Sequence, residues 1–323
     1  MKGIQHVEVS NNRAKFKFDL YRNITIVRGD SGSGKTTLYN LIAAYTREQV
    51  ASGVNLSSTK PCVALLDMDW ENQLRNTTDS IVFIDEGAAF ISSKEFAHAV
   101  KHSDNYYVIF NRESLHELPY SVTEIYEIKT SGRYHSFKRM YPEKSLHRYT
   151  SVSRARCDNF QVLLTEDSQS GYEFFQQYFQ NSSIQCVSAR TNAAIFKWLS
   201  DHPQERILVV ADGAAFGSQM DRVMKLCQAH AGAFQLCLPE SFEWLILKSG
   251  LVHADYLATM LENPSEYIES EDFFSWENYF TDYLVQNTIG TPFQYTKSRL
   301  NPVYTQENNR KRIAGEILKD IEE

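Results

Sequence analysis

A short stretch near the N-terminus, GDSGSGKT at 29–36, has the residue types and spacing of a phosphate-binding loop, G-x-x-x-x-G-K-[ST]. Its glycines let the backbone curl, so that N–H groups and the N-terminus of the following helix point at phosphate oxygens. Lys35 is spaced to reach the β- and γ-phosphates of a nucleotide, and Thr36 to bind Mg²⁺. The pattern predicts a nucleotide site formed by Gly29, Ser31, Gly32, Ser33, Gly34, Lys35, Thr36 and Thr37.

Two acids follow the next buried strand that the sequence predicts, IVFI at 81–84. Asp85, at the carboxyl end of this strand, is placed to hold the Mg²⁺ of the nucleotide, directly or through water. Glu86 beside it is a candidate general base that polarises the attacking water. The alternative for both residues is a surface acid that begins a turn.

A basic residue ends a further predicted strand of the first half. The apolar run NYYVIF at 105–110 is followed by Asn111 and Arg112. Nucleotide hydrolases with a phosphate loop often place a residue that senses the γ-phosphate at such a strand tip, and we assign Arg112 to that role. The alternative is an ordinary salt-bridged arginine.

The second half carries its own acids at strand ends. Glu166 follows the apolar run FQVLLT, and Asp212 lies in VADGAAFG, which nearly repeats the stretch FIDEGAAF around Asp85. Ligands gather at the carboxyl ends of parallel strands, so we expect Glu166 and Asp212 to share one ligand-binding edge. The alternative is ordinary polarity where two strands leave a sheet.

Two weaker features have plain explanations. His98 and His102 lie four residues apart on a predicted helix, a spacing that can grip zinc, but the sequence offers no third ligand. Asp67 and Asp69 alternate at the end of a predicted strand and are in reach of a metal only if both side chains turn inward. A solvated helix face accounts for the histidines, and a strand that enters solvent accounts for the aspartates.

Strands surround the phosphate loop in the first half. Two alternating segments, 4–10 and 14–20, flank the turn-forming NNR and predict a β-hairpin. A strand precedes the loop, a helix follows it, and VTEIYEI at 122–128 predicts the last core strand. The basic, polar stretch 129–160 predicts a terminal hairpin and then a linker, with a domain boundary near 150–158.

Strands and helices alternate regularly after this linker. Predicted strands include FQVLLTED, SIQCVSA, RILVVADG and AFQLCLPE, and a helix lies between each pair. This order predicts a small parallel sheet with helices on both faces. The tail, 251–323, is predicted to be helical and to cap this domain, and it contains Lys297 and Arg299 as candidate phosphate contacts. We therefore expect an α/β protein with domains at 1–150 and 158–323.

Composition limits the classes of function. The chain has 323 residues, of which 42% are hydrophobic and 23% charged, so two domains with real cores are expected. Residues 1–150 have a net charge of +2 and residues 151–323 a net charge of −9, which argues against a broad DNA-binding face on the second half. The sequence predicts no signal peptide or membrane span, and we expect a cytoplasmic protein without disulfides.

The hairpin, the loop VRGDSGSGKTTL and the strand IVFIDE together resemble P-loop ATPases of the ABC/AAA-like group that accompany DNA-processing and phage-defence proteins. The resemblance covers roughly 2–140 and implies an ATPase that uses Mg²⁺. The sequence lacks an LSGGQ-like signature, and only 56 residues separate Gly29 from Asp85, too few for the usual helical subdomain. ATP-driven dimerisation through a signature motif therefore has no support in this sequence.

The second half, at roughly 160–245, resembles the Toprim domain of topoisomerases, primases and OLD-family nucleases. The resemblance implies Glu166 as a general acid/base or metal-side glutamate, Asp212 as the first metal aspartate, and more weakly Glu243 in LPESFEWLIL. Two positions depart from the family pattern. Asp167 stands where glycine is common, and Ala214 stands where the second aspartate of Asp-x-Asp belongs; Asp167 or Asp221 is a candidate to replace the missing carboxylate.

These patterns favour an ATP-dependent nuclease that requires Mg²⁺ or Mn²⁺ and acts in a mobile-element or phage-defence system. Its catalytic residues would be Lys35, Glu86, Glu166 and Asp212, and its partners DNA or RNA and a second copy or another subunit. The rival is a regulatory NTPase whose degenerate Toprim-like half is a protein-interaction module. A small-molecule kinase is disfavoured, because 37–84 contains no arginine-rich lid.

Overall fold

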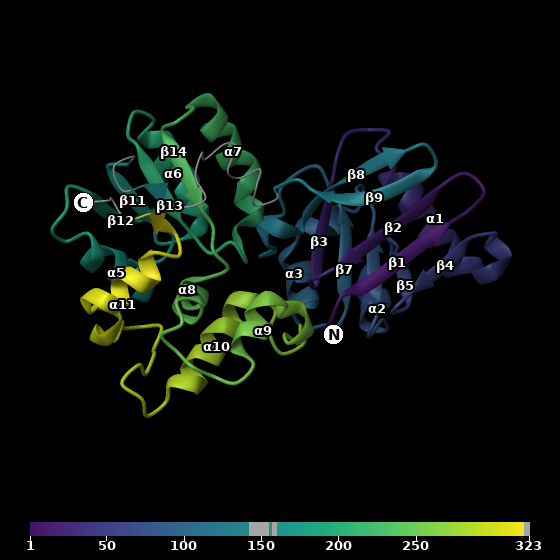
Figure 1. The fold of residues 1–323 in the computed structure, drawn as a ribbon. Coiled ribbons are helices and arrows are strands. Elements are labelled where there is room, and N and C mark those ends of the chain that lie inside the picture. The colour runs from purple at the N-terminus through teal and green to yellow at the C-terminus, as the bar shows by residue number, and fades with distance from the viewer. Residues whose placement is uncertain (142–154, 157–159, 320–323) are drawn as a thin grey trace. The chain divides into compact units, whose positions relative to one another are not determined.

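A computed structural model describes residues 1–141, 155–156 and 160–319. The chain divides into two compact units (Figure 1). The first unit comprises Met1–Tyr141 together with Asn263–Phe274, and the second comprises Pro142–Glu262 together with Ser275–Glu323. The linker and boundary expected near 150–158 fall largely outside the described residues.

A mixed sheet of nine strands forms the first unit, in the order β4-β1-β2-β9-β8-β3-β7-β6-β5. The two edge strands, β4 and β5, are consecutive in the chain with three residues between them, and the sheet is nearly closed. Its strands are β1 (Gln5–Ser10), β2 (Lys15–Leu20), β3 (Ile24–Arg28), β4 (Asn55–Ser58), β5 (Cys62–Leu65), β6 (Ile81–Ile84), β7 (Tyr106–Phe110), β8 (Ile125–Ser131) and β9 (Tyr134–Arg139).

Helix α1 (Lys35–Glu48) packs in the hollow of this sheet. Its residues Leu38 and Ile42 are fully buried in one core with side chains from β1, β2, β6 and β7. Strands β3, β6 and β7 are buried at every position, as strands covered on both faces must be. In β1 and β2 burial alternates, because one face is solvated. Two short helices, α2 (Trp70–Arg75) and α3 (Lys94–Lys101), complete the unit.

The predicted hairpin is confirmed, since β1 and β2 pair antiparallel with Gln5 opposite Leu20. A terminal hairpin is confirmed as well, formed by β8 and β9. The last core strand begins at Ile125 and not at Val122, because Ser121 caps a short 3-10 turn at 122–124. The order of strands has one consequence for the site: β7 lies between β3 and β6, so three strands of parallel direction deliver their carboxyl ends side by side.

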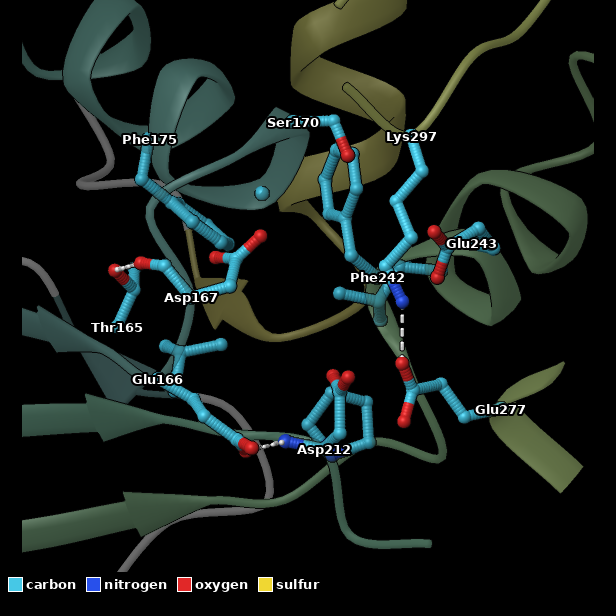
Figure 2. A pocket seen from close by; sticks show the side chains of 14 residues that line it. Thr165, Glu166, Asp167, Ser170, Phe175, Asp212, Phe242, Glu243, Glu277 and Lys297 are labelled. Atoms are coloured by element: carbon cyan, nitrogen blue, oxygen red, sulfur yellow. Dashed lines mark hydrogen bonds and ion pairs between the residues drawn. The ribbon is translucent and has the colours of Figure 1, made fainter. Parts of the chain in front are cut away.

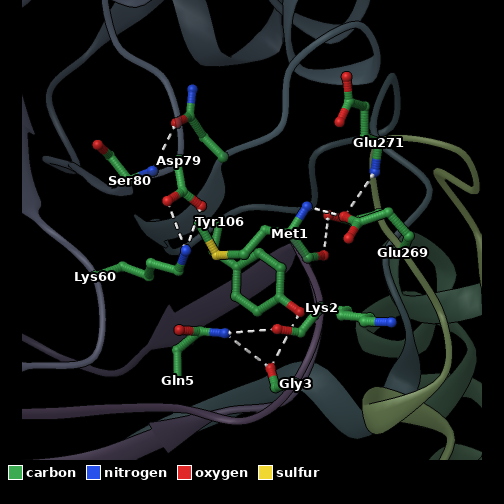
Figure 3. A network of polar contacts seen from close by, with 12 residues as sticks. Met1, Lys2, Gly3, Gln5, Lys60, Asp79, Ser80, Tyr106, Glu269 and Glu271 are labelled. Atoms are coloured by element: carbon green, nitrogen blue, oxygen red, sulfur yellow. Dashed lines mark hydrogen bonds and ion pairs between the residues drawn. The ribbon is translucent and has the colours of Figure 1, made fainter.

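Residues 263–274 pack with the first unit although they are far from it in sequence. The Gly3 amide donates to the Ser265 carbonyl at 2.7 Å, and the Ser270 amide donates to the Met1 carbonyl at 3.0 Å. The α-amino group of Met1 contacts the Glu269 carboxylate (Figure 3). Hydrogen bonds between backbone atoms therefore hold this segment against Met1 and Gly3, the residues that precede β1.

The second unit has a parallel sheet of four strands, in the order β12-β11-β13-β14, with helices between consecutive strands. The predicted small parallel α/β arrangement is confirmed. Its elements are β11 (Val162–Thr165), α5 (Ser170–Tyr178), β12 (Gln185–Ser188), α6 (Asn192–Asp201), β13 (Ile207–Val210), α7 (Met220–Ala229) and β14 (Phe234–Cys237). Two short strands, β10 (Ala155–Arg156) and β15 (Leu318–Lys319), pair parallel beside it.

Helices follow the sheet of the second unit. They are α8 (Phe242–Lys248), α9 (Leu257–Glu262), α10 (Trp276–Thr288) and α11 (Glu307–Ala314). Tyr295 and Tyr304 are fully buried, and Tyr295 and Leu300 form hydrogen bonds with Ser170 and Glu173 of α5, so this tail packs against the helices of the sheet. The tail was predicted to be helical, but its last helix ends at Ala314 and the chain continues into β15.

None of the helices in the described ranges is long and apolar enough to cross a bilayer. The four cysteines within these ranges are free thiols: Cys62, Cys186, Cys227 and Cys237. Burial raises the pKa of each, which is typical of small buried hydrophobes and not of reactive thiolates.

Candidate functional site

The phosphate-loop sequence lies between β3 and α1, and α1 begins at Lys35 directly after the last loop glycine. Gly32 and Gly34 have φ values of 84° and 101°, in the left-handed region that glycine adopts without strain. The Leu38 amide donates to the Gly34 carbonyl at 2.9 Å, so the loop runs into the first turn of the helix. The free N–H groups of that turn therefore face the loop, as phosphate binding requires.

The segments that follow β3, β6 and β7 meet at Glu86. The Lys35 ammonium lies 3.5 Å from Glu86 Oε2, and the Arg112 guanidinium contacts Glu86 Oε1. Arg112 also donates to the hydroxyl of Ser31 in the loop at 3.0 Å. The loop, the acid after β6 and the arginine after β7 thus form one cluster of opposite charges. Phosphate oxygens bound to Lys35 and Arg112 would compete with Glu86 for both cations.

The remaining predicted nucleotide-site residues lie at the same place. Asp85 is half-buried at the end of β6, and Thr36 and Thr37 are exposed on the first turn of α1. Burial, and next the charge of Asp85, raise the pKa of Tyr39, one turn further along α1. Asp85 is therefore close enough to the helix to act on it electrostatically.

Arg28 is a residue that the sequence patterns did not single out. Its buried guanidinium donates to the hydroxyl of Ser114 at 3.2 Å and to that of Tyr120 at 3.1 Å. Arg28 directly precedes the phosphate loop, and Ser114 follows Arg112 by two residues. These hydrogen bonds from Arg28 therefore hold residues 114–120, which follow β7, close to the phosphate loop. An arginine at the end of an otherwise apolar strand was the one signal of this role in the sequence.

The weaker candidates lie apart from this cluster. The rings of His98, on α3, and His102, which caps the end of α3, are tilted by 32° with centroids 4.2 Å apart; both residues are exposed and line a cavity of about 850 Å³ with Trp70. Asp67 and Asp69 are exposed, and Asp69 accepts a hydrogen bond from Asn72 at 2.6 Å where α2 begins. The histidines agree with a solvated helix face. The two aspartates are solvated as expected but do not lie on a strand, because β5 ends at Leu65 and they belong to the turn that precedes α2.

A second cavity, of about 100 Å³, lies at the carboxyl ends of β11 and β13 in the second unit (Figure 2). The two strands pair in register with Thr165 opposite Val210, so Glu166 and Asp212 leave the sheet close together. The Asp212 amide donates to Glu166 Oε2 at 3.1 Å. Five acids and one lysine line the cavity: Glu166, Asp167, Asp212, Glu243, Glu277 and Lys297.

Burial and repulsion between neighbouring carboxylates raise the pKa of three of these acids, Glu166, Asp167 and Asp212. Burial raises the pKa of Glu166 to about 7, and the Glu277 and Asp167 carboxylates add to the effect. The pKa of Asp212 lies well above its ordinary value, because of burial first and then the charges of Glu277 and Glu166. Burial also raises the pKa of Asp167. A cation that entered the cavity would therefore displace protons.

Lys297 is the one cation among the side chains that line this cavity. Its ammonium contacts the Glu277 carboxylate, and in Figure 2 it lies between Glu243 and Glu277. Burial opposes its charge, yet the carboxylates of Glu243 and Glu277 raise its pKa above the ordinary value. Lys297 therefore remains protonated. Arg299, the other candidate phosphate contact, is exposed and does not line the cavity.

The structure distinguishes the two residues proposed to replace the missing carboxylate. Asp167 lines the cavity, whereas Asp221 pairs with Lys225 at 2.9 Å on α7 and does not line it. Ala214 is buried, and its amide faces the Glu240 carbonyl at 3.4 Å. Glu277, Lys297 and Tyr295 join the site from more than 60 residues beyond Asp212, and no local pattern announced Glu277 or Tyr295.

The donor chemistry of the cavity suits Mg²⁺ or Mn²⁺, which prefer carboxylate oxygens. Within the described part of the chain, no three His, Cys, Asp or Glu side chains already converge as a metal-binding group. The cavity therefore fits Mg²⁺ or Mn²⁺ in the type and charge of its side chains, and not in a metal-binding geometry that is already formed. Glu166, Asp167, Asp212 and Glu243 are the residues that would hold the ion.

Comparisons of this chain with protein-family models, with curated proteins and with solved structures gave no match.

Proposed function

We propose that the first unit binds and hydrolyses ATP as a P-loop ATPase of the ABC/AAA-like kind. The observation that carries this proposal is the convergence of Lys35, Glu86 and Arg112 on the loop that contains Ser31. The parallel strand β7 between β3 and β6 supports it, because it brings Arg112 to the phosphate site.

The chain's own residues divide the work at this site. The loop amides and Lys35 bind and orient the phosphates, and Arg112 senses the γ-phosphate. Thr36 and Asp85 would hold Mg²⁺, which supplies charge neutralisation of the phosphates when bound. Glu86, once released from Lys35 and Arg112, accepts a proton from water and orients it for attack. Positioning and electrostatics supply most of the rate in this class of reaction.

We infer for the second unit a Toprim-like site that cleaves phosphodiester bonds of DNA or RNA with Mg²⁺ or Mn²⁺. The adjacency of Glu166 and Asp212 at two strand ends, in a cavity with three further carboxylates, supports this inference. A bound divalent ion would polarise the scissile phosphate and activate water. Glu166 is the candidate proton carrier, because its pKa of about 7 suits transfer at neutral pH.

A regulatory NTPase with a degenerate Toprim-like module is the rival proposal. Two observations favour it: Ala214 is buried where the family pattern has a carboxylate, and Lys297 already neutralises part of the cavity. In both proposals the nucleotide state of the first unit controls the second. The setting we propose is a mobile-element or phage-defence system, with a second copy or another subunit as partner.

One experiment separates these proposals. The wild type, Lys35→Ala and Asp212→Ala are incubated with labelled DNA and RNA, with and without ATP, in Mg²⁺ or Mn²⁺. We expect Lys35→Ala to lose ATP turnover and Asp212→Ala to lose cleavage. Lys17→Ala and Asp201→Ala, which alter exposed residues away from both sites, serve as matched controls. Unchanged ATP turnover in Lys35→Ala would refute the first assignment, and absence of cleavage by every form would favour the regulatory rival.

A further inference from the structure

A chain of three buried side chains runs behind the acidic cavity of the second unit. The Tyr295 hydroxyl donates to Glu243 Oε1 at 2.7 Å, and it lies 2.6 Å from the Ser170 hydroxyl. Ser170, Glu243 and Tyr295 are exposed by only 1%, 2% and 1%, respectively. Hydrogen bonds among groups buried this deeply fix their orientation, because an unmade bond would cost the full desolvation penalty.

The carboxylate of Glu243 determines which group donates in each of these two hydrogen bonds. A carboxylate accepts only, so the Tyr295 O–H donates its hydrogen bond to Glu243, and the Ser170 hydroxyl then donates to the phenol oxygen. The backbone of Tyr295 is itself fixed, since its amide donates to the Thr288 hydroxyl at 3.0 Å at the end of α10. The phenol is therefore held from the helical tail and aimed at α8.

Glu243 both accepts this hydrogen bond and lines the cavity with Glu166 and Asp212. Ala214 stands where the Toprim pattern has the second aspartate of Asp-x-Asp, so the strand ends supply one carboxylate fewer than that pattern. Of the five acids that line the cavity, Glu243 is the most deeply buried, and it comes from α8 and not from a strand end. Partners behind a ligand commonly fix its geometry and raise its affinity for metal.

We propose that Tyr295 is a positioning residue of this site: its hydroxyl, supported by Ser170, holds Glu243 as the carboxylate that replaces the one missing at position 214. This inference rests on the proposed metal-dependent function of the second unit. Tyr295 does not contact the reacting atoms, and its contribution passes through Glu243.

The test measures Mn²⁺ binding to the full-length protein by electron paramagnetic resonance, without nucleotide. The relevant binding is the part that Asp212→Ala removes. We expect Tyr295→Phe, which deletes only the hydroxyl, to weaken that binding by about tenfold or more. Cleavage by Tyr295→Phe should recover at saturating Mn²⁺, because the reacting groups are intact.

The matched control is Tyr304→Phe. Tyr304 is equally buried and packs edge-on against the Tyr295 ring, with centroids 6.0 Å apart, but its hydroxyl donates to the Phe293 carbonyl and not to a carboxylate. This variant should lose stability much as Tyr295→Phe does and should retain wild-type Mn²⁺ affinity. Equal Mn²⁺ loss in both variants would assign the effect of Tyr295 to stability alone and overturn the proposal.

A double variant tests whether Tyr295 acts through Glu243. We expect Glu243→Gln to weaken Mn²⁺ binding, and Tyr295→Phe with Glu243→Gln to weaken it no further. Additive losses would overturn the proposed route. Wild-type Mn²⁺ affinity in Tyr295→Phe would refute the inference and leave the metal site standing. If Asp212→Ala removes no Mn²⁺ binding from the wild type, the proposed metal-dependent function itself fails.

Discussion

At the scale of residues, both candidate sites depend on charges held close together. Glu86 is shared between Lys35 and Arg112 in the first unit, and Lys297 is shared between Glu243 and Glu277 in the second. In the first site Glu86 reduces the repulsion between two cations, and in the second Lys297 reduces the repulsion between carboxylates.

Replacement of Glu86 by Gln tests the role of the shared glutamate. The amide has nearly the same shape but cannot accept a proton, so hydrolysis should slow by about 10²–10⁴-fold while ATP still binds. ATP turnover and the dissociation constant of ATP are measured side by side. Glu113→Gln, an exposed acid just after Arg112, is the control. Full turnover by Glu86→Gln would remove this residue from the reaction.

The raised pKa of Glu166 predicts how the stability of the protein depends on pH. Its pKa is about 7 in the folded protein and near 4.5 in the unfolded chain, so folding favours the protonated form. Its contribution to stability is present below about pH 4.5 and is lost as pH rises through about 7. With metal chelated, the melting temperature of the wild type relative to Glu166→Gln should therefore fall between pH 5.5 and 8, by about 2–4 °C. A constant difference between the two proteins would contradict the raised pKa.

At the scale of elements, the near-repeat FIDEGAAF and VADGAAFG forms two different exits from a parallel strand. Gly213 lies so close to the neighbouring segment that an added Cβ would be 2.5 Å from the Leu238 carbonyl oxygen. Gly87, at the matching position of the first stretch, faces open space and has no positive φ. The same residue type is thus required by packing in one stretch and not in the other.

This contrast yields a paired prediction. Gly213→Ala should lower the free energy of unfolding by about 2 kcal/mol or more, because backbone must move to admit the methyl group. Gly87→Ala should leave stability within about 0.5 kcal/mol or raise it slightly, since alanine restricts the unfolded chain. Chemical denaturation of both variants measures the difference. Equal effects would show that the 238–239 segment yields freely.

Local patterns predicted most strands and helices but not which of them meet. The phosphate loop was predicted from its motif, β6 and β7 from apolar runs, and the parallel direction of the second sheet from its alternating strands and helices. The position of β7 between β3 and β6 was not, because spatial order depends on long-range packing. For the same reason, Glu166 and Asp212 were predicted from strand ends, whereas Glu277 reaches the cavity, and Tyr295 reaches Glu243, through the fold of a distant tail.

At the scale of the whole molecule, the chain passes between the two units three times, after Tyr141, Glu262 and Phe274. The last crossing is short. Phe274 belongs to the first unit, where its carbonyl accepts from the Asn23 side chain at 3.0 Å. Glu277, three residues later, lines the acidic cavity of the second unit. If nucleotide state controls the second unit, as we propose, this short connection offers a direct covalent route to a carboxylate of the cavity.

Removal of the hydrogen bond that holds Phe274 should weaken the proposed effect of ATP on cleavage without changing ATP turnover. Asn23→Ala removes the hydrogen bond to Phe274 and keeps the backbone carbonyl of residue 23, which accepts from the Tyr107 amide at 2.7 Å. We expect ATP turnover near the wild-type rate, while the effect of ATP on cleavage falls by about half or more, because one hydrogen bond is worth about 1 kcal/mol. Asn12→Ala, in the exposed turn of the first hairpin, is the matched control. An unchanged response of cleavage to ATP in Asn23→Ala would place the coupling on another crossing of the chain.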